Sequence, residues 1–399
     1  MGEGAFKDIK VLDLSEGIAG PYCTRLLGCL GAKVIKVERP GEGDKSRKMG
    51  PFPNDVPHPE KSALFLHLNI NKKSITLNLE KGAGRKILQE LVKKVDVLVE
   101  SLHPGKMEKW GLAYADLEKI HPRLVMTSIT PFGQTGPYRD FKATSAVLDA
   151  LGGHTYVIGD PKREPIRYPE GTAEYSTGMF ATVPTMGALF YAADNGVGQH
   201  IDVSIMECLA GLDWMRHARW THLHVIQKRT GGRYHAWPGK IYPCRDGWVG
   251  LAGVGPLGTL VPMYSVIDVP ELLDPKYESP ASRAEHMEEL DELVEKWLVN
   301  HDRYEVFNAL QQARVQAGVC NTAEDLLKDP GFEARKFWVE IDHPKVGRLK
   351  YPGPLLLMSE MEWSANSAPL LGEHNKEIYH DLLGYPLEEL TRLSQNGVI

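Results

Sequence analysis

The sequence of 399 residues is poor in cysteine and lacks long apolar runs. Its five cysteines form no CxxC pair, and no apolar segment typical of a signal peptide stands near the first residue. We therefore expect free thiols in a reducing, cytoplasmic environment. The longest nearly apolar run, residues 179–193, is interrupted by threonines and a proline and is too short to span a bilayer. It is interpreted as a buried helix, and no membrane partner is expected.

An excess of positive charge is also absent. The chain has 46 Lys and Arg against 52 Asp and Glu, which gives a net charge of −6 and disfavours a nonspecific nucleic-acid binder. A composition of 42% hydrophobic and 25% charged residues excludes a disordered or fibrous protein. Because single cores stop growing near ~250–300 residues, the length predicts two domains or one elaborated domain.

Strand and helix patterns alternate over the first 130 residues. Such alternation predicts an α/β fold with an open, mostly parallel sheet and ligands beyond the carboxyl ends of its strands. The predicted strands are residues 9–14, 32–38, 74–79, 96–100 and 124–129, and the predicted helices are 22–30, 84–92 and 114–120.

The pattern changes after about residue 205, where tryptophans are scattered among Gly and Pro and the strands are short. Residues 225–325 are interpreted as a second, smaller α/β domain. Its clearest helix is predicted over 283–300, because apolar residues recur there at steps of three and four. A terminal helix is predicted over 375–383.

Most common catalytic motifs are missing. Neither a GxSxG elbow nor a phosphate-binding loop is present. The turn Gly17-x-x-Gly20 lacks a glycine of the dinucleotide fingerprint, so a tight strand-to-helix turn is favoured there. The pair His222 and His224 has no accompanying ligand at a suitable spacing, and no metal is predicted.

Two other features could carry chemistry. Residues 39–48 place four cations among Pro and Gly after a predicted strand, which fits either a grip on nucleotide phosphates or a solvated basic loop. Glu174 stands just before the apolar run. A carboxylate at a helix start stays ionised and can attack an acyl carbon, although an acidic helix cap would have the same sequence.

Segments spread over the whole chain carry a family resemblance, which is weakest over 225–325. In order and spacing they resemble the family III CoA-transferases, the group that includes formyl-CoA transferase, carnitine CoA-transferase and benzylsuccinate CoA-transferase. The matching segments are residues 11–14, 19–21, 30–44, 68–79, 96–100, 103–105, 111–112, 122–125, 132–138, 196–204, 368–374 and 383–385.

The resemblance implies a Rossmann-like large domain formed by residues 1–215 and 330–399, with the small domain 225–325 inserted. It also implies that two chains interlock as a dimer. Enzymes of this family attack an acyl-CoA with an aspartate to form a mixed anhydride. CoA then passes to an acceptor acid through a second anhydride, which requires that water be excluded.

Carried onto this sequence, the resemblance places the nucleophile at Glu174, four residues before Gly178. Glutamate has the same functional group with one more methylene, so this position departs from the family. Cys29 replaces an Asp, and residues 143–145 replace a Tyr-acid pair. Ser101 and Leu102 replace the Asn-aromatic pair of the CoA site. The residues expected to bind coenzyme A are Ile18, Ala19, Arg39, Leu77, Ser101, Leu102, Lys109 and Lys142.

Three functions remain open at this point. The first is a CoA-transferase that moves CoA between an acyl-CoA and a carboxylic acid through Glu174. The second is a catalytically silent subunit that pairs with an active paralogous chain, as in benzylsuccinate CoA-transferase. The third is an acyl-CoA racemase, which is disfavoured because neither member of its His/Asp pair stands at Glu174. The expected partners are an acyl-CoA, an acid, and a second copy or paralogue of the chain.

Overall fold

The computed structural model of the protein describes residues 4–233, 237–254, 258, 260–361, 363 and 365–399. The chain forms two compact units. The first contains the residues up to His154 together with Arg167–Thr221 and Glu333–Ile399. The second contains Thr155–Ile166 and His222–Phe332.

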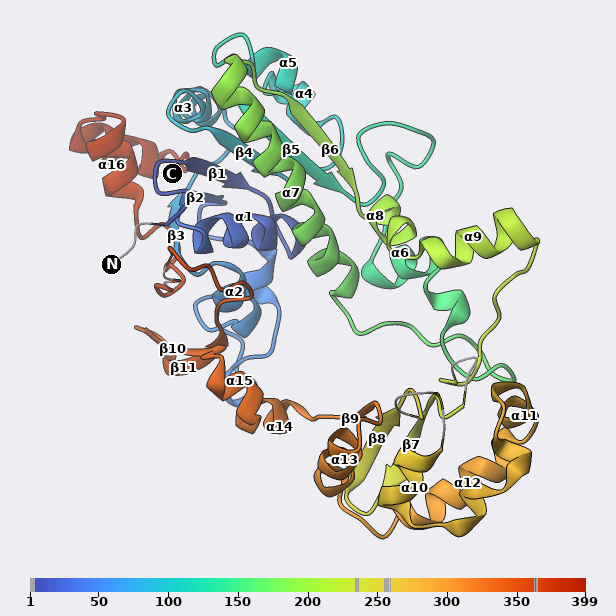
Figure 1. Cartoon of the computed structure of the whole chain (residues 1–399). Coiled ribbons are helices and arrows are strands. Elements are labelled where there is room, and N and C mark those ends of the chain that lie inside the picture. Colours follow the sequence, from blue (N-terminus) through green and yellow to red (C-terminus); the bar gives the residue numbers. More distant parts are fainter. Residues whose placement is uncertain (1–3, 234–236, 255–257, 259, 362, 364) are drawn as a thin grey trace. The chain divides into compact units, whose positions relative to one another are not determined.

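A six-stranded parallel sheet organises the first unit (Figure 1). The predicted α/β fold with a mostly parallel sheet is thereby confirmed. Strand order is β3-β2-β1-β4-β5-β6, so the order reverses between β1 and β4, where Leu14 stands opposite Glu100. The sequence analysis did not predict β6. The strands are β1 Lys10–Leu14, β2 Lys33–Glu38, β3 Lys72–Thr76, β4 Val97–Glu100, β5 Val125–Thr130 and β6 His200–Ser204.

The strands of this sheet carry apolar side chains on both faces, and helices cover and bury both of them. One face carries α1 Ala19–Cys29, α6 Ser145–Leu151, α7 Thr172–Asn195 and α8 Ile205–Leu212. The other carries α3 Gly82–Val92, α4 Lys106–Trp110, α5 Tyr114–Leu117, a π-helical segment Lys376–Leu382 and α16 Leu387–Gln395. Helix α16 was missed, and α5 is shorter than the helix predicted over 114–120.

The C-terminal segment is bound to the β3 edge of the first unit. The amide of Thr76 donates to Asn375 Oδ1 over 2.8 Å, and the Tyr379 hydroxyl donates to the carbonyl of Thr76 over 2.7 Å. The amide of Asn78 donates to the carbonyl of Val398 over 2.7 Å. Both ends of the chain therefore belong to one core. Nearby, α2 Ala63–Leu68 packs against the hairpin of β10 Trp338–His343 and β11 Gly347–Pro352.

Helix α7 corrects the expectation of a buried helix over residues 179–193. Large apolar side chains on one side of it are exposed, Val183 by 63% and Phe190 by 73%. The opposite side is buried and consists of small residues, because only these let the helix lie close to the sheet and to α1. They are Ala173, Thr177, Gly178, Ala181, Thr182, Thr185, Ala188 and Ala192.

Helices α7 and α1 lie close together at Gly178. A Cβ atom added there would lie 2.6 Å from the carbonyl oxygen of Ala19 and 3.1 Å from Tyr22 Cβ. The absence of a side chain at Gly178 therefore sets the spacing of the two helices, which lie side by side in Figure 1.

The second unit contains an antiparallel sheet in the order β7-β8-β9 and its own apolar core. The helix predicted over 283–300 is divided at His286 into two helices. Helices α9 Trp214–Leu223 and α15 Pro330–Ala334 span the borders between the units. The other elements are β7 Lys240–Cys244, β8 Gly247–Leu251, β9 Ala317–Val319, α10 Val261–Ile267, α11 Pro280–Glu285, α12 Met287–Leu298, α13 Arg303–Gln312 and α14 Ala323–Lys328.

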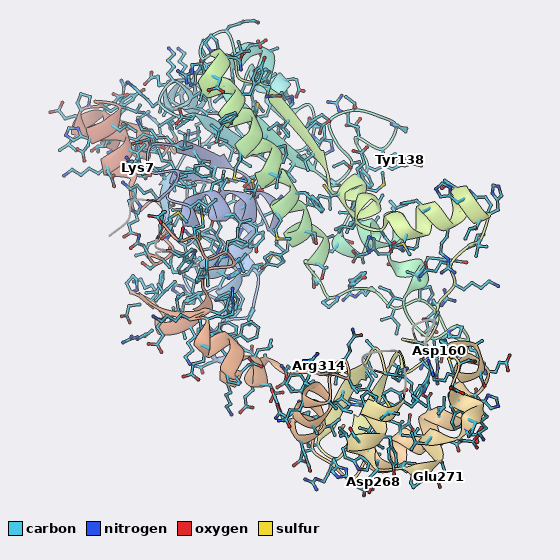
Figure 2. All side chains as sticks on the ribbon, in the orientation of Figure 1. Lys7, Tyr138, Asp160, Asp268, Glu271 and Arg314 are labelled. Carbon is cyan, nitrogen blue, oxygen red and sulfur yellow. The ribbon has the colours of Figure 1, made fainter. Side chains whose placement is uncertain are left out.

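Residues 155–166 belong to the second unit, although the sequence analysis assigned them to the large domain. Their backbone is bound to residues 229–231. Arg229 donates to the carbonyls of Asp160 (labelled in Figure 2) and Tyr156, both over 3.1 Å. The amide of Gly231 donates to the carbonyl of Gly159. Among all described helices, none combines the length and the apolar character that crossing a bilayer requires.

A pair of glycine substitutions tests the contact between α1 and α7. Gly178→Ala should lower the free energy of unfolding by about 1–3 kcal/mol, because the methyl group meets the backbone of α1. Gly211→Ala in α8 is the matched control, since no atom lies within 4 Å of the Cβ position of Gly211. Because alanine is the better helix former, this control should gain about 0.5–1 kcal/mol in urea unfolding. Equal effects of the two substitutions would contradict the contact.

Candidate active site

The reversal of strand order between β1 and β4 forms a crevice at the carboxyl ends of the strands. Two segments border it, the turn of residues 15–18 after β1 and residues 101–105 after β4. They are bound to each other, because the amide of Glu16 donates to Ser101 Oγ over 2.8 Å. This switch point is where the ligands of such sheets bind.

Buried charges fix the turn after β1. The amide of Gly17, a residue with φ of 82°, donates to Asp44 Oδ1 over 3.2 Å. Lys36 Nζ lies 2.7 Å from the Asp44 carboxylate and donates to the carbonyl of Ser15 over 2.9 Å. Since these groups have almost no access to water, moving the turn would leave a charge unpaired. The turn is therefore held firmly at its backbone.

Asp13 on β1 completes this charge cluster. Burial alone would raise the pKa of Asp13, but Lys36 and Lys72 outweigh it and hold the pKa well below its usual range. Burial lowers the pKa of Lys72 to about 8 although Asp13 lies 2.9 Å away. Asp13 is therefore ionised at neutral pH, and it holds the turn by accepting a hydrogen bond from the amide of Ser15.

A pocket of about 220 Å³ lies at the crevice and brings together three of the predicted CoA-binding residues, Arg39, Leu77 and Leu102. Leu14 and Val37 add apolar walls. The apolar walls and the guanidinium group of Arg39 suit a ligand with apolar and anionic parts, although glutamates also line the pocket.

The other predicted CoA-binding residues lie outside the lining of this pocket. Ser101 holds the backbone of Glu16 beside it. Ile18 precedes α1, with its Cδ1 atom 3.4 Å from where a Cβ of Gly171 would be, and Ala19 is buried against α7. Lys109 is exposed on α4, where Lys106 lines the pocket instead.

Lys142 is also exposed, and it follows an aromatic cluster in the loop after β5. Phe132, Tyr138 (labelled in Figure 2) and Phe141 contact one another with ring centroids 5.2–6.4 Å apart. Tyr138 and Phe141 are exposed large hydrophobic residues. Lys142 follows this cluster in the chain and precedes α6, which begins at Ser145.

The basic loop of residues 39–48 does not act as one group of cations. Arg47 has no exposed surface and lies 2.6 Å from each of the carboxylates of Glu38 and Glu60, so it is part of the fold. Arg39 and Lys45 both contact Glu16, at 3.3 and 3.0 Å. Arg39 is the cation of this loop that lines the pocket, so the predicted phosphate grip reduces to Arg39 with Lys45 beside it.

Glu174 lies in the first turn of α7, which begins after Gly171. The free amides of a helix start stabilise a carboxylate there. Ser145 Oγ, at the start of α6, donates to Glu174 Oε1 over 2.5 Å. Glu174 Oε2 is buried and has no hydrogen-bond partner among the described residues. One oxygen is thus oriented, and the other accepts no hydrogen bond from any residue that the structure describes.

A second carboxyl group, Asp149, lies on the same side of α6 as Ser145, one turn further along. It is 1% exposed, and within the described structure its Oδ1 atom has no hydrogen-bond partner. Burial and the neighbouring Glu174 raise the pKa of Asp149, whereas His154 and Arg167 counteract this rise. Buried carboxyl groups with perturbed pKa values are characteristic of functional sites.

The sequence analysis missed Asp149, the contact of Ser145, and an aromatic group at the start of α7. Tyr175 packs edge-on against Tyr22 with centroids 4.9 Å apart, and His67 lies 6.0 Å from Tyr175. Burial lowers the pKa of His67 to about 3, so this imidazole is neutral. No local sequence pattern marks these residues, because they come from separate elements. In the described parts of the chain, no three His, Cys, Asp or Glu side chains are grouped to hold a metal ion.

Comparison with known proteins identifies the class. CoA-transferase family III matches residues 6–375, and the chain belongs to this family of enzymes. It is 33% identical to a succinyl-CoA–D-citramalate CoA-transferase of Chloroflexus aurantiacus, over 98% of this chain and 97% of that protein. It is also 33% identical to the succinyl-CoA–L-malate CoA-transferase beta subunit of the same organism, over 98% and 97%.

The fold is likewise that of the family. A crystal structure of a CAIB/BAIF family protein from Brucella suis superimposes with a TM-score of 0.85 at 28% identity. The match covers 96% of this chain and 100% of that one.

Removal of the Ser145 hydroxyl tests its contact with Glu174. Ser145→Ala should lower kcat for CoA transfer by about 10-fold or more with little change in the KM for acyl-CoA, because a hydrogen bond to a charged group contributes ~1.5–3 kcal/mol. Ser145→Thr keeps the hydroxyl and should restore most of kcat. A wild-type kcat in the alanine variant would show that Ser145 does not position Glu174.

Proposed function

We propose that the chain is an active CoA-transferase that moves CoA from an acyl-CoA to a carboxylic acid, with Glu174 as nucleophile. The observation that carries this proposal is the carboxylate of Glu174 at the start of α7, with Oε1 bound by Ser145 and Oε2 unpaired among the described residues. A nucleophile needs one atom oriented and one free, and this arrangement provides both.

The reaction would proceed in four acyl-transfer steps without a net proton change. Glu174 attacks the thioester carbonyl, expels the CoA thiolate and forms a mixed anhydride. The thiolate attacks the glutamyl carbonyl and releases the donor acid, which leaves a glutamyl-CoA thioester. The acceptor carboxylate attacks this thioester and again expels the thiolate. Attack of the thiolate on the acceptor acyl carbonyl forms the new acyl-CoA and regenerates Glu174.

CoA would be bound at the switch point. Arg39, Leu77 and Leu102 support this because they line one pocket, and Ser101 supports it by holding the turn beside that pocket. Ile18 and Ala19 would contribute through this turn, since it leads into α1 and α1 contacts the start of α7. Lys109 and Lys142, both exposed, would contact only the parts of CoA that extend into solvent.

The activity is tested with the purified chain alone. We expect it to form new acyl-CoA thioesters, detected by liquid chromatography, from succinyl-CoA and a panel of acceptors that includes citramalate, malate, glutarate and oxalate. Glu174→Ala should lower the rate by at least ~10³-fold, since the covalent route is lost. Glu174→Asp moves the carboxylate by ~1 Å and should cost ~100-fold.

The alternative is a silent subunit of a heteromeric enzyme. It is supported by the glutamate in place of aspartate and by the relative named as a beta subunit. In that case the chain alone would be inactive, and activity would appear on addition of a paralogous chain regardless of the residue at position 174.

We also propose that the chain forms an interlocked dimer. Its support is the exposed apolar side of α7, since contiguous apolar surface on a lone chain indicates a partner. The side chains concerned are Met179, Phe180, Val183, Phe190 and Tyr191.

Charge substitutions on this side of α7 test the dimer. Light scattering should give twice the 44.5 kDa of one chain for the wild type, and Val183→Glu with Phe190→Glu should shift it towards one chain mass. Ile120→Glu is the control, because it places the same charge at another exposed apolar residue away from α7. A wild-type monomer, or dissociation by the control as well, would argue against this interface.

A further inference from the structure

An acidic side chain, Glu16, is part of the lining of the pocket at the switch point. Glu16 Oε1 lies 3.3 Å from Arg39 Nε, and Glu16 Oε2 lies 3.0 Å from Lys45 Nζ. Both Glu16 and Arg39 line the pocket. The two oxygens of one carboxylate therefore bridge two cations at the place where the anionic groups of a ligand would bind.

The backbone of Glu16 is fixed, whereas the two cations that its side chain contacts are largely exposed. Ser101 Oγ accepts from the amide of Glu16, and the next residue, Gly17, is bound to the buried Asp44. Glu16 itself is 15% exposed, whereas Arg39 and Lys45 are 50% and 73% exposed. The carboxylate thus stays in the lining of the pocket, and the side chains of Arg39 and Lys45 extend to it.

A second cation in the lining of this pocket, Lys106, is also paired with a carboxylate. Lys106 lies 3.3 Å from Glu80, and both residues line the pocket. A ligand phosphate that approaches Arg39 would have to replace a carboxylate that is already there. Phosphate carries more charge and more acceptor oxygens than a carboxylate, so it can replace Glu16, but the displaced carboxylate remains nearby and repels it.

We infer that Glu16 is an internal competitor of the phosphate groups of CoA for Arg39 and Lys45, and that it weakens the binding of CoA. This inference rests on the proposed function, because it takes CoA as the ligand of the pocket. Weaker binding has a use in a transferase, since the enzyme must release one acyl-CoA after each cycle. Glu16 would reduce the part of the free energy of CoA binding that comes from the phosphate groups, and the part that comes from the pantetheine arm would be unchanged.

Titration calorimetry with CoA, dephospho-CoA and pantetheine tests this role. Glu16→Gln keeps the size of the side chain and the backbone contact with Ser101 but removes the charge. It should bind CoA about three- to tenfold more tightly, since two partly exposed ion pairs no longer compete. Pantetheine, which has no phosphate, should bind as it does to the wild type. The thermal midpoint of each variant shows that it is folded.

Glu42→Gln is the matched control. Glu42 lines the same pocket and lies 4.0 Å from Lys48, and in the part of the chain that the structure describes it forms no ion pair with Arg39 or Lys45. Glu42→Gln removes the same charge as Glu16→Gln. An increase in CoA affinity that is clearly smaller than the increase in Glu16→Gln therefore supports direct competition. Equal gains in the two variants would indicate a general charge effect and would overturn the role of Glu16.

The remaining outcomes also decide the question. Unchanged or weaker CoA binding by Glu16→Gln overturns the inference, because Glu16 would then orient the cations rather than compete for them. Equal tightening of pantetheine overturns it as well. If the wild type transfers CoA in these cases, the proposed function stands. A wild type that neither binds CoA nor transfers it contradicts both.

Discussion

The contact between α1 and α7 at Gly178 connects the two parts of the candidate site. Glu174 lies one helical turn before Gly178, and Ala19 directly follows the turn of residues 15–18. Because Gly178 has no side chain, the backbone of α1 comes close enough to bring the start of α7 to that turn. The position of the carboxylate relative to the crevice therefore depends on one backbone approach. This dependence also explains why the buried side of α7 consists of small residues.

A buried group of charges fixes the other side of this arrangement. Asp13, Lys36 and Asp44 hold the turn after β1 through Ser15 and Gly17. Such groups cost desolvation energy and contribute little net stability, but an alternative backbone position would leave a buried charge unpaired. The cluster thus defines one conformation of the turn. The exposed cations Arg39 and Lys45 of the neighbouring loop are paired with Glu16 of this turn.

The sheet could be predicted because strands buried on both faces give continuous apolar segments that alternate with helical periods. The start of a helix near Glu174 could be predicted from the apolar run that follows it. The exposure of Val183 and Phe190 could not be predicted, because the apolar pattern of a helix is the same whether its side chains pack in a core or against a partner chain. Ser145 lies 29 positions from Glu174, and no local pattern encodes such a contact. For the same reason the burial of Arg47 by Glu38 and Glu60 was not foreseen.

The central claim is that Glu174 becomes covalently attached to the substrate. The chain alone is incubated with an acyl-CoA, treated with hydroxylamine or borohydride, digested and analysed by mass spectrometry. The account predicts modification of the peptide that contains Glu174 and none in Glu174→Ala. Transfer activity without any modification of Glu174, or modification of another carboxylate instead, would contradict it.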